Sequence, residues 1–391
     1  ANKVVNVLFG TDQIKNFKLS KTKKQINKIT QHVKMVELSV ASIILGITIG
    51  FILFPTVIYF VRELYLKSKN KRKFAGPVKA GAVLVTGSNS GIGEMMVAEL
   101  VKNNFHVFAG VRSAKKGKGV EKKHPKGAVT HVIMDVSEPS TLEDAVELMR
   151  EAIDTNEACA DGLVAVVNCA GINKQGPLEF QPIDQFASVL NVNVTGQIAV
   201  TQAVLPLLRT AKTPGRVVFL GSGAGFVAGS MQGAYCASKY ALEAVADCLR
   251  RELSAWDMSV SLIQAGQFET TLTSSYDDEK KGLLTSPAWR DTNANHFYGQ
   301  YYDNSFPQRS SWFGKPRIIK DAIMDAITSP YPQTRYLVGS KLFMSSVSML
   351  YSVKWFIPDR FQDAELAPRQ WPKKKWLKNI PAINAFPSGN R

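Results

Sequence analysis

The sequence predicts an α/β fold built on a doubly wound parallel sheet. From residue 82 onward, short apolar runs alternate with stretches of helical length. Nearly every position in these runs is apolar, as expected for parallel strands that helices cover on both faces. The first run also leads into a glycine-rich turn, which is typical of such folds. The predicted strands are residues 82–86, 106–111, 129–134, 163–168, 216–221 and 260–265.

Residues 36–61 are predicted to form a transmembrane helix. Leu38–Val61 are 24 residues without a charge, and as a helix they would extend about 36 Å, enough to cross a bilayer. A secretory signal peptide fits poorly because the apolar run is too long and begins too late. A buried core helix is the alternative. A basic extension, residues 1–35, precedes this segment, and a basic linker, residues 62–80, follows it.

The globular domain is predicted to span residues 81–340. Its regular alternation stops between residues 271 and 314, where aromatic side chains are frequent. We interpret this insert as a lid over a substrate site, and a folded surface excursion is the alternative. Residues 341–371 are apolar but interrupted by serines and Lys354, which suits a segment lying on a membrane surface. Residues 372–391 are predicted to form a basic tail.

The positive charge is concentrated outside the globular domain. The formal net charge is +16: residues 1–80 hold 15 Lys and Arg against 3 acids, residues 372–391 hold 5 against none, and residues 81–371 are at −1. A nucleic-acid-binding domain would carry a basic face on its folded part, so no nucleic acid is expected as a partner. The flanks are predicted to contact anionic membrane lipid or acidic partner proteins, with solvated tails as the alternative.

Cysteine and histidine give no sign of a metal site. The four cysteines have no paired spacing, and no two of the five histidines stand at i and i+4. We therefore predict no metal and interpret the cysteines as reduced thiols in the core.

The turn after the first predicted strand is a candidate dinucleotide site. It contains Gly87, Ser90, Gly91, Ile92 and Gly93 and leads into a predicted helix. Glycine is needed here because the turn is tight and the backbone must approach a pyrophosphate closely. The helix N-terminus then presents unpaired N–H groups to the pyrophosphate charge.

The residue after the second predicted strand bears on which dinucleotide binds. An acid there would bind the 2′-hydroxyl of the adenosine ribose, whereas Arg112 can pair with a 2′-phosphate. The sequence therefore favours NADP(H), and NAD(H) is the alternative. An exposed arginine without a ligand is the remaining interpretation.

A tyrosine and a lysine are spaced for proton transfer. Tyr235 and Lys239 stand at i and i+4, so they share one face of a helix. An ammonium beside a phenol favours the phenolate and lowers the tyrosine pKa from about 10 toward the working pH, as a general acid/base for an alcohol requires. Ser222 follows the fifth predicted strand, thirteen residues before Tyr235.

The ordered set of motifs resembles the short-chain dehydrogenase/reductase family over roughly residues 80–360, and the resemblance implies a Rossmann fold. It makes Tyr235 the general acid/base and Lys239 the residue that tunes it and holds the nicotinamide ribose. It makes Ser222 the partner of the substrate oxygen and Asn193 the support of a proton-relay water.

The same resemblance implies the contacts to the cofactor. Asp135 would face the adenine, and Asn168 would brace the sheet near the dinucleotide. Two positions depart from the family pattern, because Ala265 replaces a proline and Cys169 replaces a second asparagine; both bear on how the nicotinamide is positioned. Together with Arg112, the candidate cofactor-binding residues are Gly87, Ser90, Gly91, Ile92, Gly93, Asp135, Val136, Asn168, Ala170, Gly171, Tyr235, Lys239, Gly266 and Thr270.

Within the family, the stretches VFAGVR, EAVADCLRREL, SPYPQTRYLVG and WFIP resemble a branch that contains retinol and hydroxysteroid dehydrogenases and mitochondrial membrane 3-hydroxybutyrate dehydrogenases. That branch is often membrane-bound and usually prefers NAD(H), so Arg112 departs from it. The resemblance implies hydride transfer between a nicotinamide and a lipophilic alcohol or carbonyl compound, a substrate class that suits the aromatic insert.

A second function class remains open, in which the chain is an accessory subunit of a larger mitochondrial membrane complex and keeps the fold and a bound dinucleotide. The predicted span and the basic flanks motivate it, because a soluble enzyme needs neither. We expect a homo-oligomer or a subunit of a larger membrane assembly. The predicted location is a single-pass anchor in the mitochondrial inner membrane, rather than in the endoplasmic reticulum.

Overall fold

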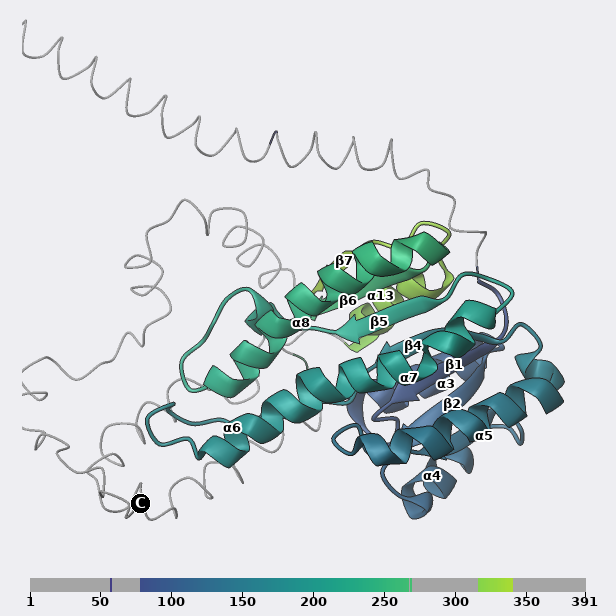
Figure 1. Cartoon of the computed structure of the whole chain (residues 1–391), viewed down its shortest axis with the longest axis horizontal. Coiled ribbons are helices and arrows are strands. Elements are labelled where there is room, and N and C mark those ends of the chain that lie inside the picture. Colours follow the sequence, from purple (N-terminus) through teal and green to yellow (C-terminus); the bar gives the residue numbers. More distant parts are fainter. Residues whose placement is uncertain (1–56, 58–77, 267, 269–315, 340–391) are drawn as a thin grey trace, which may run out of the picture. The chain divides into compact units, whose positions relative to one another are not determined.

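The computed structural model of the protein describes residue 57, residues 78–266, residue 268 and residues 316–339 (Figure 1). The predicted lid, the membrane-surface segment, both basic tails and, apart from Val57, the predicted transmembrane helix lie outside these residues. None of the helices that the structure describes combines the length and apolar character needed to cross a bilayer. In chain order the elements are β1 (Ala82–Thr86), α3 (Gly91–Lys102), β2 (His106–Val111), α4 (Ala114–Glu121), β3 (Val129–Ile133), η1 (Pro139–Thr141), α5 (Leu142–Thr155), η2 (Glu157–Cys159), β4 (Leu163–Asn168), α6 (Ile183–Leu190), η3 (Asn191–Thr195), α7 (Gly196–Thr210), β5 (Arg216–Leu220), η4 (Gly223–Gly225), α8 (Gly233–Glu252), η5 (Leu253–Trp256), β6 (Ser259–Ala265), α13 (Pro316–Thr328) and β7 (Arg335–Val338).

The seven strands among the described residues form one parallel sheet in the order β3-β2-β1-β4-β5-β6-β7. The doubly wound α/β prediction is therefore confirmed, and the six predicted strands are observed with ends that differ by at most one residue. The seventh strand, β7, was not predicted. It is only four residues long, begins with Arg335 at the edge of the sheet, and pairs with Leu262 of β6.

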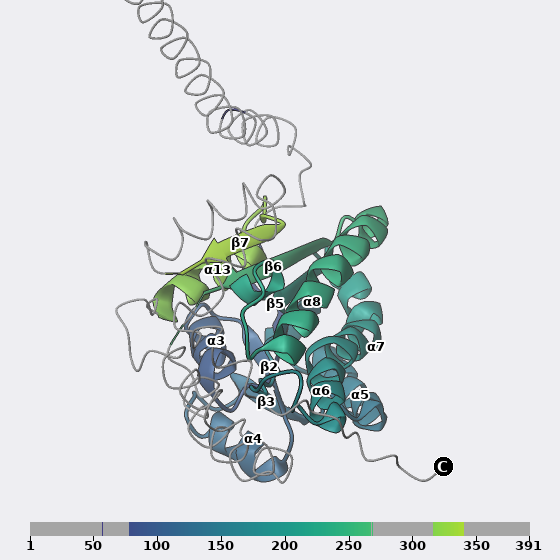
Figure 2. The same cartoon turned by 90° about the vertical axis from the view of Figure 1, so that its left-hand side faces the viewer.

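Helices cover both faces of the sheet (Figure 2). Val83 and Val85 of β1 point to the face packed by α3 and α13. Ala82 and Leu84 point to the other face, which α5, α7 and α8 cover. Both sets are fully buried, and each buried valine or leucine contributes about 1.5–3 kcal/mol relative to an exposed one. This two-sided burial explains why the strands are apolar at consecutive positions.

The sheet has a switch point between β1 and β4. The chain leaves β1 toward β2 on one side and later returns to β4 on the other side. The crevice at the carboxyl ends of two such strands is the usual ligand site of open α/β sheets. Gly87 follows β1 and Cys169 follows β4, so the predicted dinucleotide residues lie at this crevice.

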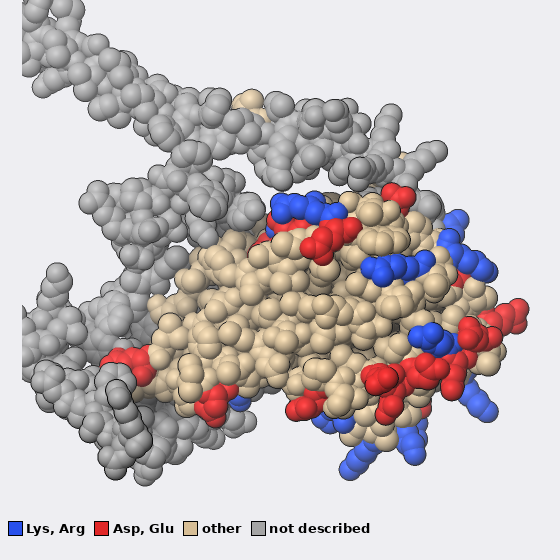
Figure 3. Space-filling view, viewed as in Figure 1, with Lys and Arg blue, Asp and Glu red and all other residues tan. Residues whose placement is uncertain are grey.

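Helices α6 and α7 form one continuous helix that η3 interrupts with a π-helical turn at Asn191–Thr195 (Figure 1). Single π-helical turns inside α-helices frequently occur at functional sites. The face drawn in Figure 3 carries interspersed acidic and basic side chains at one end, with no continuous basic stripe across its described residues.

The prediction that the cysteines are core thiols is correct for Cys159 and Cys236 and wrong for Cys248, which is exposed; Cys169 is half-buried, and all four thiols are free. Cys248 lies near the C-terminal end of α8. It borders a shallow apolar groove of about 230 Å³ whose other lining residues are Ile198, Thr201, Gln202, Ala244, Val245 and Leu249. None of the predicted site residues that the structure describes lines this groove.

Candidate active site

The glycine-rich turn leaves no room for side chains. Gly87 has φ +66°, and a Cβ there would lie 3.1 Å from the Ala170 Cα. A Cβ on Gly93 would lie 2.3 Å from the Gly87 carbonyl oxygen. Ser90 is the N-cap of α3, yet its side chain makes no capping hydrogen bond. The backbone cradle and the uncapped helix N-terminus fit a pyrophosphate, which would accept hydrogen bonds from the unpaired N–H groups.

Gly93→Ala tests this cradle through stability. Alanine normally stabilises a helix relative to glycine, but here the new methyl would collide with the Gly87 carbonyl, so we expect a loss of about 1–3 kcal/mol. At Gly119 in α4, by contrast, none of the described atoms lies within 4 Å of the place that a methyl group would take. Gly119→Ala should therefore gain up to about 1 kcal/mol. Chemical unfolding of both variants measures this, and a Gly93→Ala variant at least as stable as the wild type would contradict the tight cradle.

Two hydroxyl groups that the sequence did not single out hold the turn in place. Thr86 Oγ1 accepts hydrogen bonds from the backbone N–H groups of Cys169 and Ala170, both at 3.0 Å. Ser88 Oγ donates to the Val85 carbonyl at 2.6 Å. The Thr86 bonds tie the end of β1 to the residues after β4, and the Ser88 bond closes the turn onto β1. A hydroxyl residue beside the first glycine was the available sequence signal.

The predicted adenosine residues lie at the carboxyl ends of β2 and β3. Arg112 is exposed directly after β2. Burial raises the pKa of Asp135, but two hydrogen bonds from Ser137 to Asp135 Oδ1, at 2.6 and 3.0 Å, and the nearby Arg112 charge outweigh it and hold that pKa below its ordinary value. Asp135 is therefore an ionised acceptor at neutral pH. Val136 is buried, and its carbonyl packs against Gly196 of α7.

The carboxyl end of β4 is the point where the predicted groups converge. Asn168 is fully buried, and its Nδ2 donates to Thr201 Oγ1 of α7 at 3.1 Å. Ala170 and Gly171 follow, and a Cβ on Gly171 would lie 3.3 Å from Asn193 Oδ1. The structure therefore brings the β4 end, the glycine turn and the π-helical turn together.

Asn193 uses its whole side-chain amide on neighbouring protein groups. Its Oδ1 accepts from the Ile172 N–H at 2.8 Å, and its Nδ2 donates to the Ile172 carbonyl at 2.9 Å and to Ser238 Oγ at 3.0 Å. Ser238 Oγ in turn donates to the Tyr235 carbonyl at 2.7 Å. A relay water supported by Asn193 would therefore contact its backbone, and the side chain links the π-helical turn to the helix of Tyr235.

Tyr235 and Lys239 share one face of α8, as the sequence predicted. Lys239 Nζ lies 5.5 Å from the centre of the Tyr235 ring and donates to the Leu220 carbonyl at the end of β5, at 2.7 Å. Ser222 follows β5 and begins the η4 turn, which packs on α8. Ser222 Oγ accepts a hydrogen bond from the Ala224 N–H at 3.1 Å. The Ser222 hydroxyl can therefore still donate its hydrogen to a ligand oxygen.

Lys239 is buried, and the pKa of its amine is lowered. Burial lowers its pKa to about 8, and the neighbouring Cys169 thiol opposes the shift. Burial also raises the pKa of Cys169 to about 12, so this thiol stays protonated at neutral pH. A buried ammonium that is close to losing its proton at the working pH is typical of sites that move protons.

The segment after β4 and the segment before α8 are joined by a hydrogen bond at Met231, four residues before Tyr235. The Gly176 N–H donates to the Met231 carbonyl at 2.8 Å. Met231 has φ +66°, a left-handed conformation that costs a non-glycine residue about 1–2 kcal/mol. Such strain is frequent at ligand sites, where the surrounding structure holds it.

The last two predicted cofactor residues have different outcomes. The Gly266 N–H donates to the Val338 carbonyl at 2.7 Å, which places Gly266 at the carboxyl ends of β6 and β7. Thr270 lies outside the described residues.

Comparison with known proteins identifies the family. The family model for short chain dehydrogenases matches residues 81–281. Mouse "Retinol dehydrogenase 16" is 34% identical over 278 residues, which cover 68% of this chain and 84% of that protein. Bovine "D-beta-hydroxybutyrate dehydrogenase, mitochondrial" is 32% identical over 271 residues, covering 66% of this chain and 77% of that protein.

A bacterial relative carries a cofactor in its name. The "NADPH-dependent 3-dehydrocapnine reductase" of Ornithobacterium rhinotracheale is 30% identical over 284 residues, covering 72% of this chain and 94% of that protein. The family match covers more than half of the chain, and the relatives are dehydrogenases and a reductase. The chain therefore belongs to the short-chain dehydrogenase/reductase family, as an oxidoreductase of the branch that includes the retinol and hydroxybutyrate dehydrogenases.

Proposed function

We propose that this oxidoreductase is membrane-anchored, uses NADP(H), and transfers hydride between the nicotinamide and a hydrophobic alcohol or carbonyl compound. The observation that carries the proposal is the buried Lys239 ammonium 5.5 Å from the Tyr235 ring, on the helix that borders the Ser222 turn. This arrangement can deliver a proton to, or take one from, an oxygen atom at the mouth of the switch point.

Each side chain then has one task in the reaction. Ser222 donates a hydrogen bond to the substrate oxygen and orients it. Tyr235 gives its proton to that oxygen during carbonyl reduction and takes it back during alcohol oxidation. The positive charge of Lys239 stabilises the phenolate that this transfer leaves behind. When bound, the nicotinamide supplies or accepts the hydride.

The basic end of β2 supports NADP(H) over NAD(H). Arg112 is exposed directly after β2, and Lys115 and Lys116 in the first turn of α4 are also exposed. Ser113, the N-cap of α4, makes no side-chain capping bond, and the first turn of α4 has no acid. Three cations and an uncapped helix N-terminus suit a 2′-phosphate. The NADPH-dependent relative supports the same choice.

The pKa of Lys239 predicts a pH dependence. Because that pKa is lowered to about 8, the ammonium loses its proton as the pH rises through about 8. We expect kcat/KM for carbonyl reduction to fall above this pH. Lys239→Arg keeps its positive charge, so its residual activity should not show this fall. Profiles of kcat/KM for both proteins between about pH 6 and 10 measure it, and a wild-type profile that stays level across this range would contradict the role of Lys239.

An assay on the full chain in detergent tests the proposal as a whole. We expect turnover of hydrophobic ketones, aldehydes or alcohols with NADP(H), and at least about tenfold lower efficiency with NAD(H). A chain that binds the dinucleotide tightly but turns over no member of the panel would instead favour the accessory-subunit function. Gentle solubilisation adds a second criterion, because an accessory subunit migrates only within a much larger particle.

The proposed anchor, residues 36–61, is supported by its 24 consecutive uncharged residues. The basic flanks would contact anionic lipid, and the mitochondrial inner membrane is the proposed location. The full chain should remain in the membrane pellet after an alkaline carbonate wash. Release into the supernatant would rule out the anchor without affecting the proposed chemistry.

A further inference from the structure

We propose that Gln197 is a positioning residue for the cofactor, and that one buried water molecule between the side-chain oxygens of Gln197 and Asn168 completes its contact. The inference rests on the proposed function, because it concerns the backbone on which the dinucleotide would lie. Gln197 is on α7, one helical turn after Asn193, and is 1% exposed. Its Nε2 donates to the Ala170 carbonyl at 2.9 Å.

Four groups close a ring between β4 and α7. Asn168 Nδ2 donates to Thr201 Oγ1 at 3.1 Å, and Thr201 Oγ1 donates to the Gln197 carbonyl at 2.7 Å. The Gln197 side chain in turn donates to the carbonyl of Ala170, two residues after Asn168, which closes the ring. All three side chains are at most 1% exposed. These side chains are therefore shielded from bulk solvent.

Two side-chain oxygens of these groups lack a hydrogen-bond donor in the part of the chain that the structure describes. Asn168 Oδ1 and Gln197 Oε1 are buried, and neither has a hydrogen-bond partner among the described residues. Exchanging the oxygen and nitrogen of the Asn168 amide would not help, because the Thr201 hydroxyl already donates to the Gln197 carbonyl. Unpaired buried acceptors are strongly unfavourable.

Water is the ligand that fits. One water molecule donates two hydrogen bonds, which matches two amide oxygens, and buried waters commonly satisfy polar groups of this kind. The two oxygens would repel an anion. The ring offers no carboxylate, which a divalent cation of the oxygen-binding type would require.

Both backbone groups of Ala170, its N–H and its carbonyl, are consequently hydrogen-bonded to side chains. Thr86 Oγ1 accepts from its N–H at 3.0 Å, and Gln197 donates to its carbonyl at 2.9 Å. Ala170 also lies against Gly87, whose Cβ position is 3.1 Å from the Ala170 Cα. Gln197 therefore sets the spacing between the end of β4 and the glycine turn, where a dinucleotide would lie.

Gln197→Leu removes the nitrogen and the oxygen of the side-chain amide and keeps a side chain of similar volume. In the cofactor-free full chain, the backbone amides of Cys169 and Ala170 should exchange with deuterium about tenfold faster, and the dissociation constant of NADPH should rise about tenfold, as for the loss of one buried hydrogen bond. Gln202→Leu is the matched control, because Gln202 is more accessible to solvent on the same helix, and it should change neither quantity. Unchanged exchange in Gln197→Leu would overturn the positioning role.

Gln197→Glu provides a second variant in case the leucine variant does not fold. A carboxyl group can donate to the Ala170 carbonyl only when it is protonated, so the NADPH affinity should recover as the pH falls, relative to wild type. A merely structural role predicts no such recovery. A high-resolution crystal structure of the wild-type chain should show a water molecule within hydrogen-bonding distance of both amide oxygens. If no water molecule were found between the two oxygens, the proposed buried water would be disproved. The exchange measurement needs no cofactor, so it separates failure of this inference from failure of the proposed function.

Discussion

Tyr235→Phe should lower kcat by about 10²–10⁴-fold, the usual contribution of a general acid/base. The substitution removes the oxygen that would exchange a proton with the substrate, while the ring that lies 5.5 Å from Lys239 Nζ is kept. We therefore expect kcat and kcat/KM to fall together, because the lost interaction forms in the transition state. Steady-state kinetics with a responsive hydrophobic substrate, together with a fluorescence titration of NADPH, measure both parts.

Tyr240→Phe is the matched control for this variant. Tyr240 is also on α8, one residue after Lys239, and it is exposed. Its loss of a hydroxyl should leave kcat within about twofold of the wild type, as for a surface substitution away from the site. If Tyr235→Phe turned over at the wild-type rate, Tyr235 would not be the proton donor and the chemistry would have to be assigned to other groups.

The sheet was predictable because its strands are buried on both faces. Continuous apolar runs marked β1 to β6, and the structure places each of them within one residue of its predicted ends. Strand β7 follows a different rule. Its Arg335 is held by Glu243 at 2.8 Å and Asp247 at 3.0 Å, both on α8. Burial along β7 alternates over only four residues, so its pattern differs from the continuous apolar runs of the other strands and is short.

The candidate site was predictable in part. The spacing of Tyr235 and Lys239 predicted a shared helical face because i, i+4 neighbours are local. Thr86 and Gln197 were missed because each acts on a backbone atom that is distant in the sequence. The side chain of Asn193 likewise binds the backbone of Ile172. Local spacing identifies groups that act on a ligand, whereas groups that hold the backbone in place appear only once the chain has folded.

Arg112→Asp should reverse the proposed preference for NADP(H) over NAD(H). Charge-assisted hydrogen bonds to a 2′-phosphate contribute about 1.5–3 kcal/mol, and an aspartate there would also repel the phosphate, so we expect the affinity for NADPH to fall about 100-fold. The new carboxylate can accept hydrogen bonds from the 2′-hydroxyl of NADH, whose affinity should rise. Titration of both dinucleotides measures the ratio of their dissociation constants in each protein.

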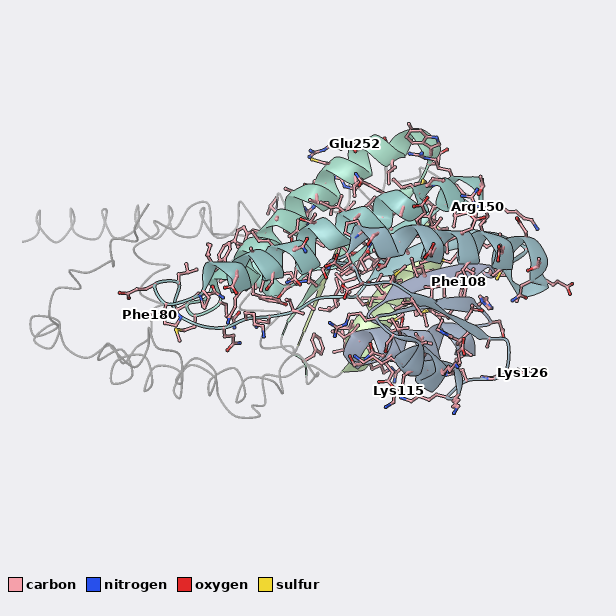
Figure 4. The ribbon with its side chains drawn as sticks, turned by 60° about the horizontal axis from the view of Figure 1, so that its bottom comes forward. Phe108, Lys115, Lys126, Arg150, Phe180 and Glu252 are labelled. Carbon is pink, nitrogen blue, oxygen red and sulfur yellow. The ribbon has the colours of Figure 1, made fainter. Side chains whose placement is uncertain are left out.

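Lys126→Glu separates this local effect from a change in net charge. Lys126 is an exposed cation in the loop after α4, at the end of the helix away from Lys115 (Figure 4). Lys126→Glu changes the net charge by the same amount as Arg112→Asp. The side chain at position 126, however, would not be within hydrogen-bonding distance of a 2′-phosphate. The NADPH affinity of Lys126→Glu should therefore change by less than about threefold at physiological ionic strength, where exposed charges are screened beyond about 8 Å. Equal losses in the two variants would mean that general electrostatic attraction, and not contact with Arg112, selects NADP(H).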